Sequence, residues 1–157
     1  MINTKNLIWT NLNQVNNIPD QVLTWLDDHQ SLTVKLKQKF NRFSINVLSQ
    51  AESLIHADET GLLDWQGQSI VREVELLGNG QVVVFARSII PITNDTQNLL
   101  KIGSRPLGEV LFNDKNIKRS QLQITHTHDA WGRRSIFTIG STQVLVSEFF
   151  IKNLYAL

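Results

Sequence analysis

The chain has 157 residues, of which 41% are hydrophobic and 18% charged, and its formal net charge is +1 at pH 7. This composition is typical of one globular domain over residues 1–157, and it excludes a disordered chain and the strongly basic surface of many nucleic-acid-binding proteins. The absence of cysteine excludes disulfides, zinc–thiolate sites and cysteine nucleophiles, and it fits a reducing cytoplasm.

No part of the sequence indicates export or membrane insertion. Residues 1–17 are polar and rich in Asn, and they lack the apolar core of a signal peptide. No apolar run approaches the roughly 20 residues that a membrane-spanning helix needs. We therefore expect a cytoplasmic protein without a membrane-inserted segment, and the modest net charge favours a monomer.

The first third of the chain predicts two short helices and a strand. Apolar residues at helical spacing predict a helix over 21–28, and Ser31 is a suitable N-cap for a second helix. Alternation of apolar and polar residues over 43–47 predicts a strand. Residues 51–67 are expected to form a loop with partial helix.

A β-hairpin is the clearest local prediction. Two apolar segments, 68–77 and 81–90, flank Gly78-Asn79-Gly80. Asn-Gly is preferred in a type I′ turn because both residues tolerate positive φ. Pro91 ends the second of these strands.

The remaining segments complete the predicted fold. Residues 94–102 suit a helix that Gly103 stops, and 104–112 suit a short helical turn. Three antiparallel strands are expected near 117–127, 133–139 and 143–151, with turns at 128–132 and 140–142. The sequence therefore predicts a single α+β domain with an antiparallel sheet of about six strands and short helices packed at one side.

Arg72 stands out because its predicted strand places it on an apolar face. Alternation puts Arg72 beside Ile70 and Val74, whereas Glu73 and Glu75 mark the wetter face. A buried charge costs on the order of several kcal/mol unless it is paired. Something anionic must therefore meet Arg72, either a protein carboxylate or a bound ligand.

Glu148 repeats this anomaly on the last predicted strand, where it shares a face with Val144, Val146 and Phe150. One interpretation is a structural ion pair between Arg72 and Glu148 across the sheet. The other is that both line a cavity and hold opposite ends of a small polar ligand, since an arginine fork favours a planar carboxylate. Periodicity alone gives the two interpretations equal weight.

Other polar residues carry weaker signals. Arg133-Arg134-Ser135 opens a predicted strand, where charges commonly protect a sheet edge. Arg87 and Arg119 fit ion-pair or surface residues that could also line a site. His126 and His128 have a spacing that a metal site could use, but they lack a clear third ligand, so ordinary polar residues near a turn are the better interpretation.

Several short motifs follow one another in a characteristic order. They are Trp25-Leu26, Ser31-Leu32-Thr33, Arg72-Glu73-Val74, Phe85-Ala86-Arg87-Ser88 ending at Pro91, Pro106-Leu107-Gly108-Glu109 with Leu111-Phe112, Arg133-Arg134-Ser135, and Glu148-Phe149-Phe150. Each motif alone is weak, but their order and spacing over residues 20–151 resemble the chorismate pyruvate-lyase family, the bacterial enzymes that open ubiquinone biosynthesis. After Phe150 the family's usual Leu-Pro is replaced by Ile151-Lys152.

The resemblance implies a lyase that converts chorismate to 4-hydroxybenzoate and pyruvate in an enclosed cavity, without a metal or organic cofactor. Arg72 falls on the family position that binds the ligand carboxylate, and Glu148 on the position that hydrogen-bonds the ring hydroxyl. Two further contacts fall on Leu32, where the family often has Met, and on Leu107 through its backbone. Arg134 is our candidate for the carboxylate of the enolpyruvyl side chain. Segments 31–40 and 104–113 are expected to cover the site.

A non-catalytic binding module is the competing class. Effector-sensing domains of some bacterial transcription regulators resemble this fold and normally follow a DNA-binding helix-turn-helix. Only residues 1–20 precede the first predicted helix and the net charge is +1, so we expect no nucleic-acid partner. A free-standing carrier or sensor of aromatic acids is the alternative, and release of pyruvate from chorismate separates it from the enzyme.

Overall fold

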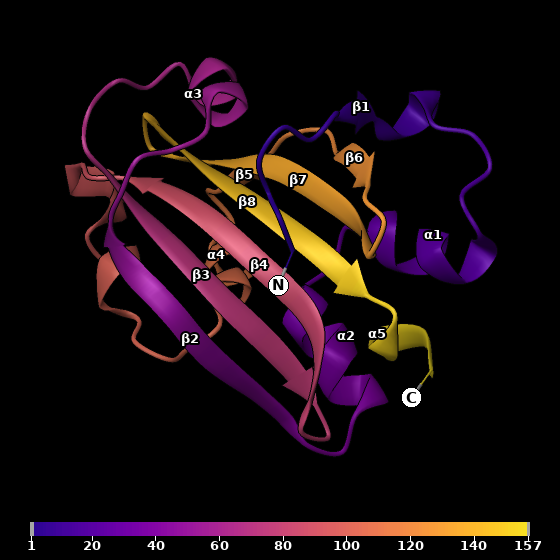
Figure 1. Cartoon of the computed structure of the whole chain (residues 1–157). Coiled ribbons are helices and arrows are strands. Elements are labelled where there is room, and N and C mark those ends of the chain that lie inside the picture. The colour runs from indigo at the N-terminus through magenta and orange to yellow at the C-terminus, as the bar shows by residue number, and fades with distance from the viewer. Residues whose placement is uncertain (1, 157) are drawn as a thin grey trace.

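Eight antiparallel strands form one sheet in the computed structural model, which describes residues 2–156 (Figure 1). The strands are β1 (Thr10–Asn11), β2 (Phe43–Glu52), β3 (Ser69–Gly78), β4 (Gln81–Pro91), β5 (Lys118–Arg119), β6 (Gln123–His126), β7 (Ala130–Ile139) and β8 (Thr142–Ile151). Their order is β1-β6-β7-β8-β4-β3-β2, and β5 pairs with β7. The expected α+β class is confirmed, with eight strands instead of about six, because β1 and β5 are too short to show alternation.

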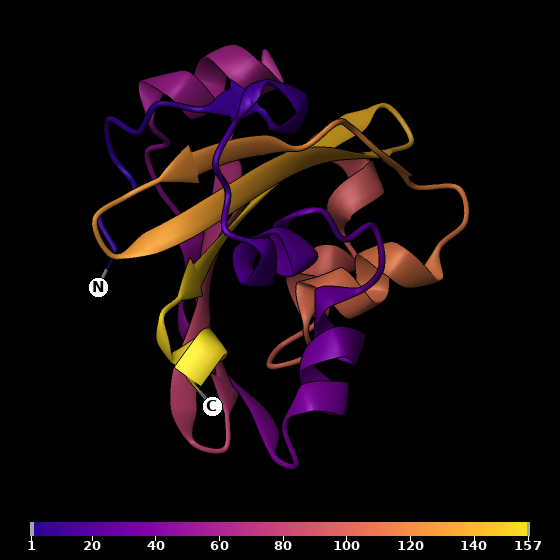
Figure 2. The same cartoon turned by 90° about the vertical axis from the view of Figure 1, so that its right-hand side faces the viewer.

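Helices flank this sheet on both faces. They are α1 (Asp20–Leu26), α2 (Leu32–Lys39), α3 (Ala57–Leu63), α4 (Leu107–Asn113) and α5 (Asn153–Ala156), with 3-10 turns η1 (Leu12–Gln14), η2 (Asn94–Thr96) and η3 (Leu99–Lys101). Figure 2 shows α1 and α2 on one side of β7 and β8, and α3 on the other. No helix within residues 2–156 is long and apolar enough to cross a membrane.

The two faces of the sheet have separate apolar clusters. On one face, Val74 packs against Leu26 of α1 and Leu36 of α2. We call this side the helix face. On the opposite face, Leu63 of α3 packs against Val71, so the expectation that all helices pack at one side is wrong for α3. The parity of β3 therefore sends Val74 and Val71 to different clusters, as strand alternation requires.

The hairpin expected from Gly78-Asn79-Gly80 is confirmed between β3 and β4. Asn79 has φ 51° and Gly80 has φ 82°, which are the positive values that a type I′ turn needs. A Cβ at position 78 would lie 2.5 Å from the ring of Phe40, so only glycine fits there. The β3–β4 register then shifts by one residue between Leu76 and Leu77, and beyond this irregularity Arg72 faces Ser88 across the hairpin.

The segment expected to be one helix over 94–102 forms the two 3-10 turns η2 and η3 instead. The Thr93 carbonyl accepts hydrogen bonds from Thr96 Oγ1 at 3.2 Å and from Gln97 Nε2 at 2.8 Å. These side chains compete with the backbone donors that would continue a helix.

The expected turn at 128–132 is shorter in the structure, because β7 begins at Ala130. Thr127 Oγ1 accepts hydrogen bonds from the backbone N–H groups of Asp129 and Ala130 at 3.2 Å and 2.9 Å. The start of β7 at Ala130 adds residues to the strand that neighbours Glu148.

The segment expected as one strand over 117–127 is divided into β5 and β6.

Candidate active site

A cavity of about 50 Å³ lies between the helix face of the sheet and helices α2 and α4. Its wall is largely apolar, with side chains such as Val74, Leu111 and Val146, and a few polar groups converge on it. An apolar wall with a small number of placed polar groups is typical of a small-molecule site. This volume is well below the roughly 300–1,000 Å³ of most ligand pockets, so a ring-sized ligand needs a wider cavity than this one.

Four of the five site residues expected from the sequence line this cavity. Arg72 comes from β3, Glu148 from β8, Leu32 from α2 and Leu107 from α4. The sheet order brings the two charged residues together, because β4 alone separates β3 from β8. The two helices supply the apolar side chains that cover them.

Arg72 is 2% exposed and carries its charge without a carboxylate partner among residues 2–156. Its Nη1 donates to Gln50 Oε1 at 2.8 Å and to the Gly103 carbonyl at 2.9 Å, and its Nη2 donates to the Arg105 carbonyl at 3.0 Å. Burial lowers the pKa of Arg72 because desolvation penalises the charged form. A buried guanidinium held by neutral acceptors is therefore ready to receive an anion.

Glu148 accepts a hydrogen bond at 2.9 Å from Nε of Arg133, so the ion pair between Arg72 and Glu148 is not formed. Arg133 is itself 1% exposed, and its Nη1 donates to the carbonyls of Trp25 and Asp28 at 3.0 Å and 2.9 Å. These carbonyls at the end of α1 fix the guanidinium, which in turn fixes one carboxylate oxygen. In the described part of the chain, the second oxygen of Glu148 accepts no hydrogen bond.

Arg134, the fifth of the expected site residues, does not line this cavity. Its Nε donates to Gln123 Oε1 at 2.8 Å, its Nη1 pairs with Asp58, and its guanidinium lies 4.4 Å from the Trp9 ring centroid. Successive strand residues point to opposite faces, so only one of Arg133 and Arg134 can face the helices. The structure places Arg133 on that side.

Arg119 lines the cavity as well, although its sequence context favoured an ion-pair or surface residue over a site residue. It lines the same space as Arg72 and Glu148, and its Nε donates to Ser135 Oγ at 2.8 Å. It belongs to the two-residue strand β5, where alternation gives no signal. The one signal that could have found it is the parity of β7, which puts Ser135 on the same face as Arg133.

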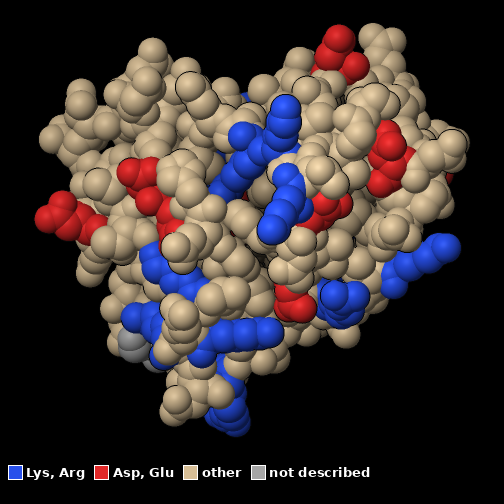
Figure 3. Space-filling model, turned by 180° about the vertical axis from the view of Figure 1, so that it is seen from behind, with Lys and Arg blue, Asp and Glu red and all other residues tan. Residues whose placement is uncertain are grey.

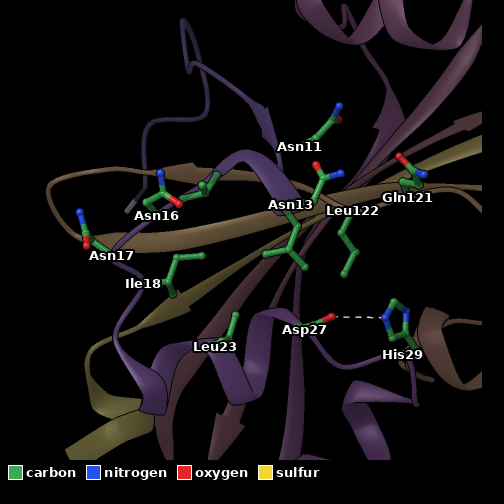
Figure 4. Close-up of a pocket in the computed structure, with 12 residues that line it drawn as sticks. Asn11, Asn13, Asn16, Asn17, Ile18, Leu23, Asp27, His29, Gln121 and Leu122 are labelled. Carbon is green, nitrogen blue, oxygen red and sulfur yellow. Dashed lines mark ion pairs between the residues drawn. The ribbon is translucent and has the colours of Figure 1, made fainter.

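The other candidate features lie outside this cavity. A shallower groove of about 620 Å³ beside η1 is lined by amide side chains such as Asn11 and Asn13, and Figure 4 shows its exposed Asp27–His29 ion pair at 3.3 Å. It contains no buried charge. His126 stacks on Trp131 with 3.8 Å between ring centroids, and no group of three His, Asp or Glu side chains within residues 2–156 could hold a metal ion.

The fold and the cavity define a small α+β protein in which a cavity lined by a buried arginine lies between an open antiparallel sheet and short helices. A sequence model described as chorismate lyase matches residues 3–156. The chain therefore belongs to the chorismate lyase family.

Curated relatives agree with this membership. The chain is 34% identical over 166 residues to a probable chorismate pyruvate-lyase of Aromatoleum aromaticum, covering 89% of each chain. It is also 34% identical over 173 residues to a probable chorismate pyruvate-lyase 2 of Pseudomonas fluorescens, covering 99% of this chain and 94% of the relative. Among solved structures, the C-terminal domain of the histidine utilization repressor of Pseudomonas syringae pv. tomato has a TM-score of 0.57 at 9% identity, covering 74% of this chain and 96% of that one. This last likeness concerns the fold alone.

Proposed function

We propose that the protein is a chorismate pyruvate-lyase, which eliminates pyruvate from chorismate and leaves 4-hydroxybenzoate, the reaction that opens ubiquinone biosynthesis. The observation that carries the proposal is Arg72, a 2% exposed guanidinium without a carboxylate partner in the described chain, at the wall of an apolar cavity in a member of this family. The proposal includes a cytoplasmic, monomeric enzyme that needs no metal or organic cofactor.

The two ends of the substrate ring would meet different groups. Arg72 pairs with the ring carboxylate, because a guanidinium fork matches a planar carboxylate. Glu148 holds the 4-hydroxyl, with Arg133 keeping its carboxylate oriented at 2.9 Å. Leu32 and the backbone of Leu107 then hold the ring from the helices. This arrangement sets the ring in one orientation along the sheet.

The reaction needs little covalent help from the protein. The ether C–O bond to the ring breaks, the hydrogen on the neighbouring hydroxyl-bearing ring carbon leaves as a proton, and the enolpyruvate takes up a proton to become pyruvate. Aromatisation of the ring supplies the driving force. Catalysis then consists of binding the reactive conformer and stabilising the charge that develops on the leaving group.

Entry and release require movement around the cavity. Helices α2 and α4 meet at the surface through Lys37 Nζ and Glu109 Oε2, 3.6 Å apart. Figure 3 shows Lys and Arg side chains near the centre of the face seen from behind, with Asp and Glu side chains beside them. Because the small cavity must open to release the flat product, we expect product release to be slower than chemistry.

The test is to mix purified protein with chorismate and a chelator and to follow 4-hydroxybenzoate and pyruvate together. Equal amounts of both products are expected. A thermal shift with 4-hydroxybenzoate but no pyruvate would contradict the proposal and favour a carrier or sensor of aromatic acids. Single-turnover kinetics that show release faster than chemistry would contradict slow release alone.

A further inference from the structure

The cavity carries more positive charge than its own carboxylates neutralise. Arg133 is paired with Glu148, and the neighbouring Asp28 is paired with Lys35 at 3.2 Å. Arg72 and Arg119 have no carboxylate within ion-pair distance among residues 2–156. Two guanidinium charges are therefore left facing one small space, which suits a ligand with two anionic groups.

Arg119 retains unused hydrogen-bond donors. Its Nε donates to Ser135 Oγ at 2.8 Å, and its Nη1 lies 3.5 Å from the Asp28 carbonyl, at the limit for a hydrogen bond. Within the described chain, its Nη2 has no protein acceptor. A guanidinium has five N–H donors in a fixed fork, so most of those of Arg119 are available to a ligand.

Two aromatic rings hold this guanidinium in place. Its central carbon lies 5.5 Å from the ring centroid of Phe112 and 5.2 Å from that of Phe137. Such cation–π contacts favour one orientation without using any N–H donor. Burial, together with repulsion by Arg133, lowers the pKa of Arg119 to about 10, so the group stays charged at neutral pH, and the attraction of an incoming carboxylate would offset the cost of its desolvation.

The strand register places the two free arginines at opposite sides of the cavity. Arg72 pairs across the sheet with Ser88, Ser88 with Val146, and Val146 with Ser135, the residue that holds Arg119. Three strand spacings separate the ends of this row, or about 14 Å between backbones. The long side chains of Arg72 and Arg119 can therefore contact two groups of one small ligand.

Glu148 sets the orientation of the ligand in the cavity. It lies in the next cross-strand row, where it accepts a hydrogen bond from Arg133. The charge of Arg133 is close enough to Arg119 to lower the pKa of Arg119. In chorismate the enolpyruvyl ether is attached beside the hydroxyl-bearing carbon, and the ring carboxylate lies at the far end. A ligand whose hydroxyl meets Glu148 therefore directs its side-chain carboxylate towards Arg119 and its ring carboxylate towards Arg72.

We propose that Arg119 binds the enolpyruvyl carboxylate of chorismate and stabilises the charge that moves onto the enolpyruvate as the C–O bond breaks. This inference rests on the proposed lyase function. It makes Arg119 a catalytic residue that touches the leaving group, in the role that the sequence assigned to Arg134. The product 4-hydroxybenzoate lacks this carboxylate, so Arg119 contributes to turnover of substrate and not to affinity for product.

The test compares Arg119→Gln with wild type in two measurements, kcat/KM for chorismate and the Kd of 4-hydroxybenzoate by calorimetry. We expect kcat/KM to fall by at least roughly tenfold, as the loss of a charge-assisted contact implies, while the Kd changes less than about threefold. Arg42→Gln, at an exposed arginine outside the cavity, should leave both values unchanged. A normal kcat/KM in Arg119→Gln, or an equal loss of product affinity, would overturn the inference.

Arg119→Lys tests the same inference if Arg119→Gln does not fold. Arg119→Lys keeps the charge but loses the planar fork, and we expect an intermediate kcat/KM with unchanged product affinity. An equal loss of kcat/KM for chorismate and of affinity for 4-hydroxybenzoate in Arg119→Lys would also overturn the inference. Wild-type protein that forms no pyruvate would instead defeat the proposed function, so the two failures are distinguishable.

Discussion

Glu148 receives its hydrogen bond from Arg133 at 2.9 Å, and not from Arg72, the buried arginine that shares its face of the sheet. The carbonyls at the end of α1 hold Arg133, whereas Gln50 and two loop carbonyls hold Arg72. The two arginines therefore differ in their partners. Arg133 is paired with a carboxylate, whereas Arg72 contacts only neutral acceptors among residues 2–156.

Arg72→Ala is expected to lower kcat/KM by at least roughly 100-fold, mainly through KM, because the ring carboxylate loses its charge-assisted partner. Affinity for 4-hydroxybenzoate should fall as well. Steady-state kinetics and calorimetry measure both effects, with Arg42→Ala as the matched control at an exposed site. Wild-type catalytic efficiency in Arg72→Ala would refute the carboxylate-binding role.

Glu148→Gln keeps the shape of the side chain and removes its charge. We expect the variant to lose about 2–3 kcal/mol of unfolding free energy, because Arg133 is then buried without a counter-charge, although Glu148 is 15% exposed and solvent weakens the pair. Urea unfolding measures this loss, and unchanged stability would contradict the pairing.

The activity of Glu148→Gln distinguishes two roles of Glu148, positioning of the ring and proton transfer. A glutamine can still accept a hydrogen bond from the substrate hydroxyl, so we expect pyruvate formation to continue if Glu148 only positions the ring. Activity reduced by more than about 1000-fold in folded protein would instead assign proton transfer to Glu148.

The far face of the sheet carries a buried ion pair that lies outside the cavity. Arg87 donates from Nε and Nη2 to the two carboxylate oxygens of Glu59, each at 2.9 Å, and both residues are less than a tenth exposed. Glu59→Ala should cost about 3–5 kcal/mol of stability, since it leaves Arg87 without its principal partner. Folded variant protein should bind 4-hydroxybenzoate like wild type, and a selective loss of binding would contradict this division between the faces.

Tyr155 has a buried hydroxyl without a hydrogen-bond partner among residues 2–156. Burial raises its pKa from 10.0 to about 12, so the folded state holds the proton more tightly than the unfolded state. Its contribution to stability is complete below about pH 10 and is lost as the pH rises towards about 12. Tyr155→Phe should therefore be as stable as wild type at pH 7, or up to about 1–2 kcal/mol more stable, because an unpaired polar group is removed.

Urea unfolding of Tyr155→Phe at pH 7 and at pH 11 checks both parts of this expectation. Wild type should lose more stability than the variant between the two pH values. A variant that is clearly less stable at pH 7 would show that the hydroxyl has a partner.

Long strands made most of the site predictable. The ten residues of β3 and of β8 give enough alternation for the sequence alone to place Arg72 and Glu148 on apolar faces of their strands. The partners of these residues were not predictable, because Gln50 and the carbonyls of Gly103 and Arg105 come from segments distant in sequence. The motif order supplied Leu32 and Leu107, whose helices show no separate ligand signal.

The errors also have physical causes. Arg133-Arg134 contains two cations in successive positions, and only the true start of β7 at Ala130, together with its register, decides which of them faces the cavity. Arg119 lies on a strand of two residues, so periodicity could not place it. The 3-10 turns of 94–102 result from side-chain bonds to the Thr93 carbonyl that a helical pattern does not reveal.

A crystal structure of the protein with 4-hydroxybenzoate would show whether this cavity binds the aromatic ring between Arg72 and Glu148. We expect the ring between α2, α4 and the sheet, with its carboxylate on the Arg72 guanidinium and its hydroxyl on the free oxygen of Glu148. Product bound in the groove beside η1, or bound in the cavity with its carboxylate away from Arg72, would contradict it.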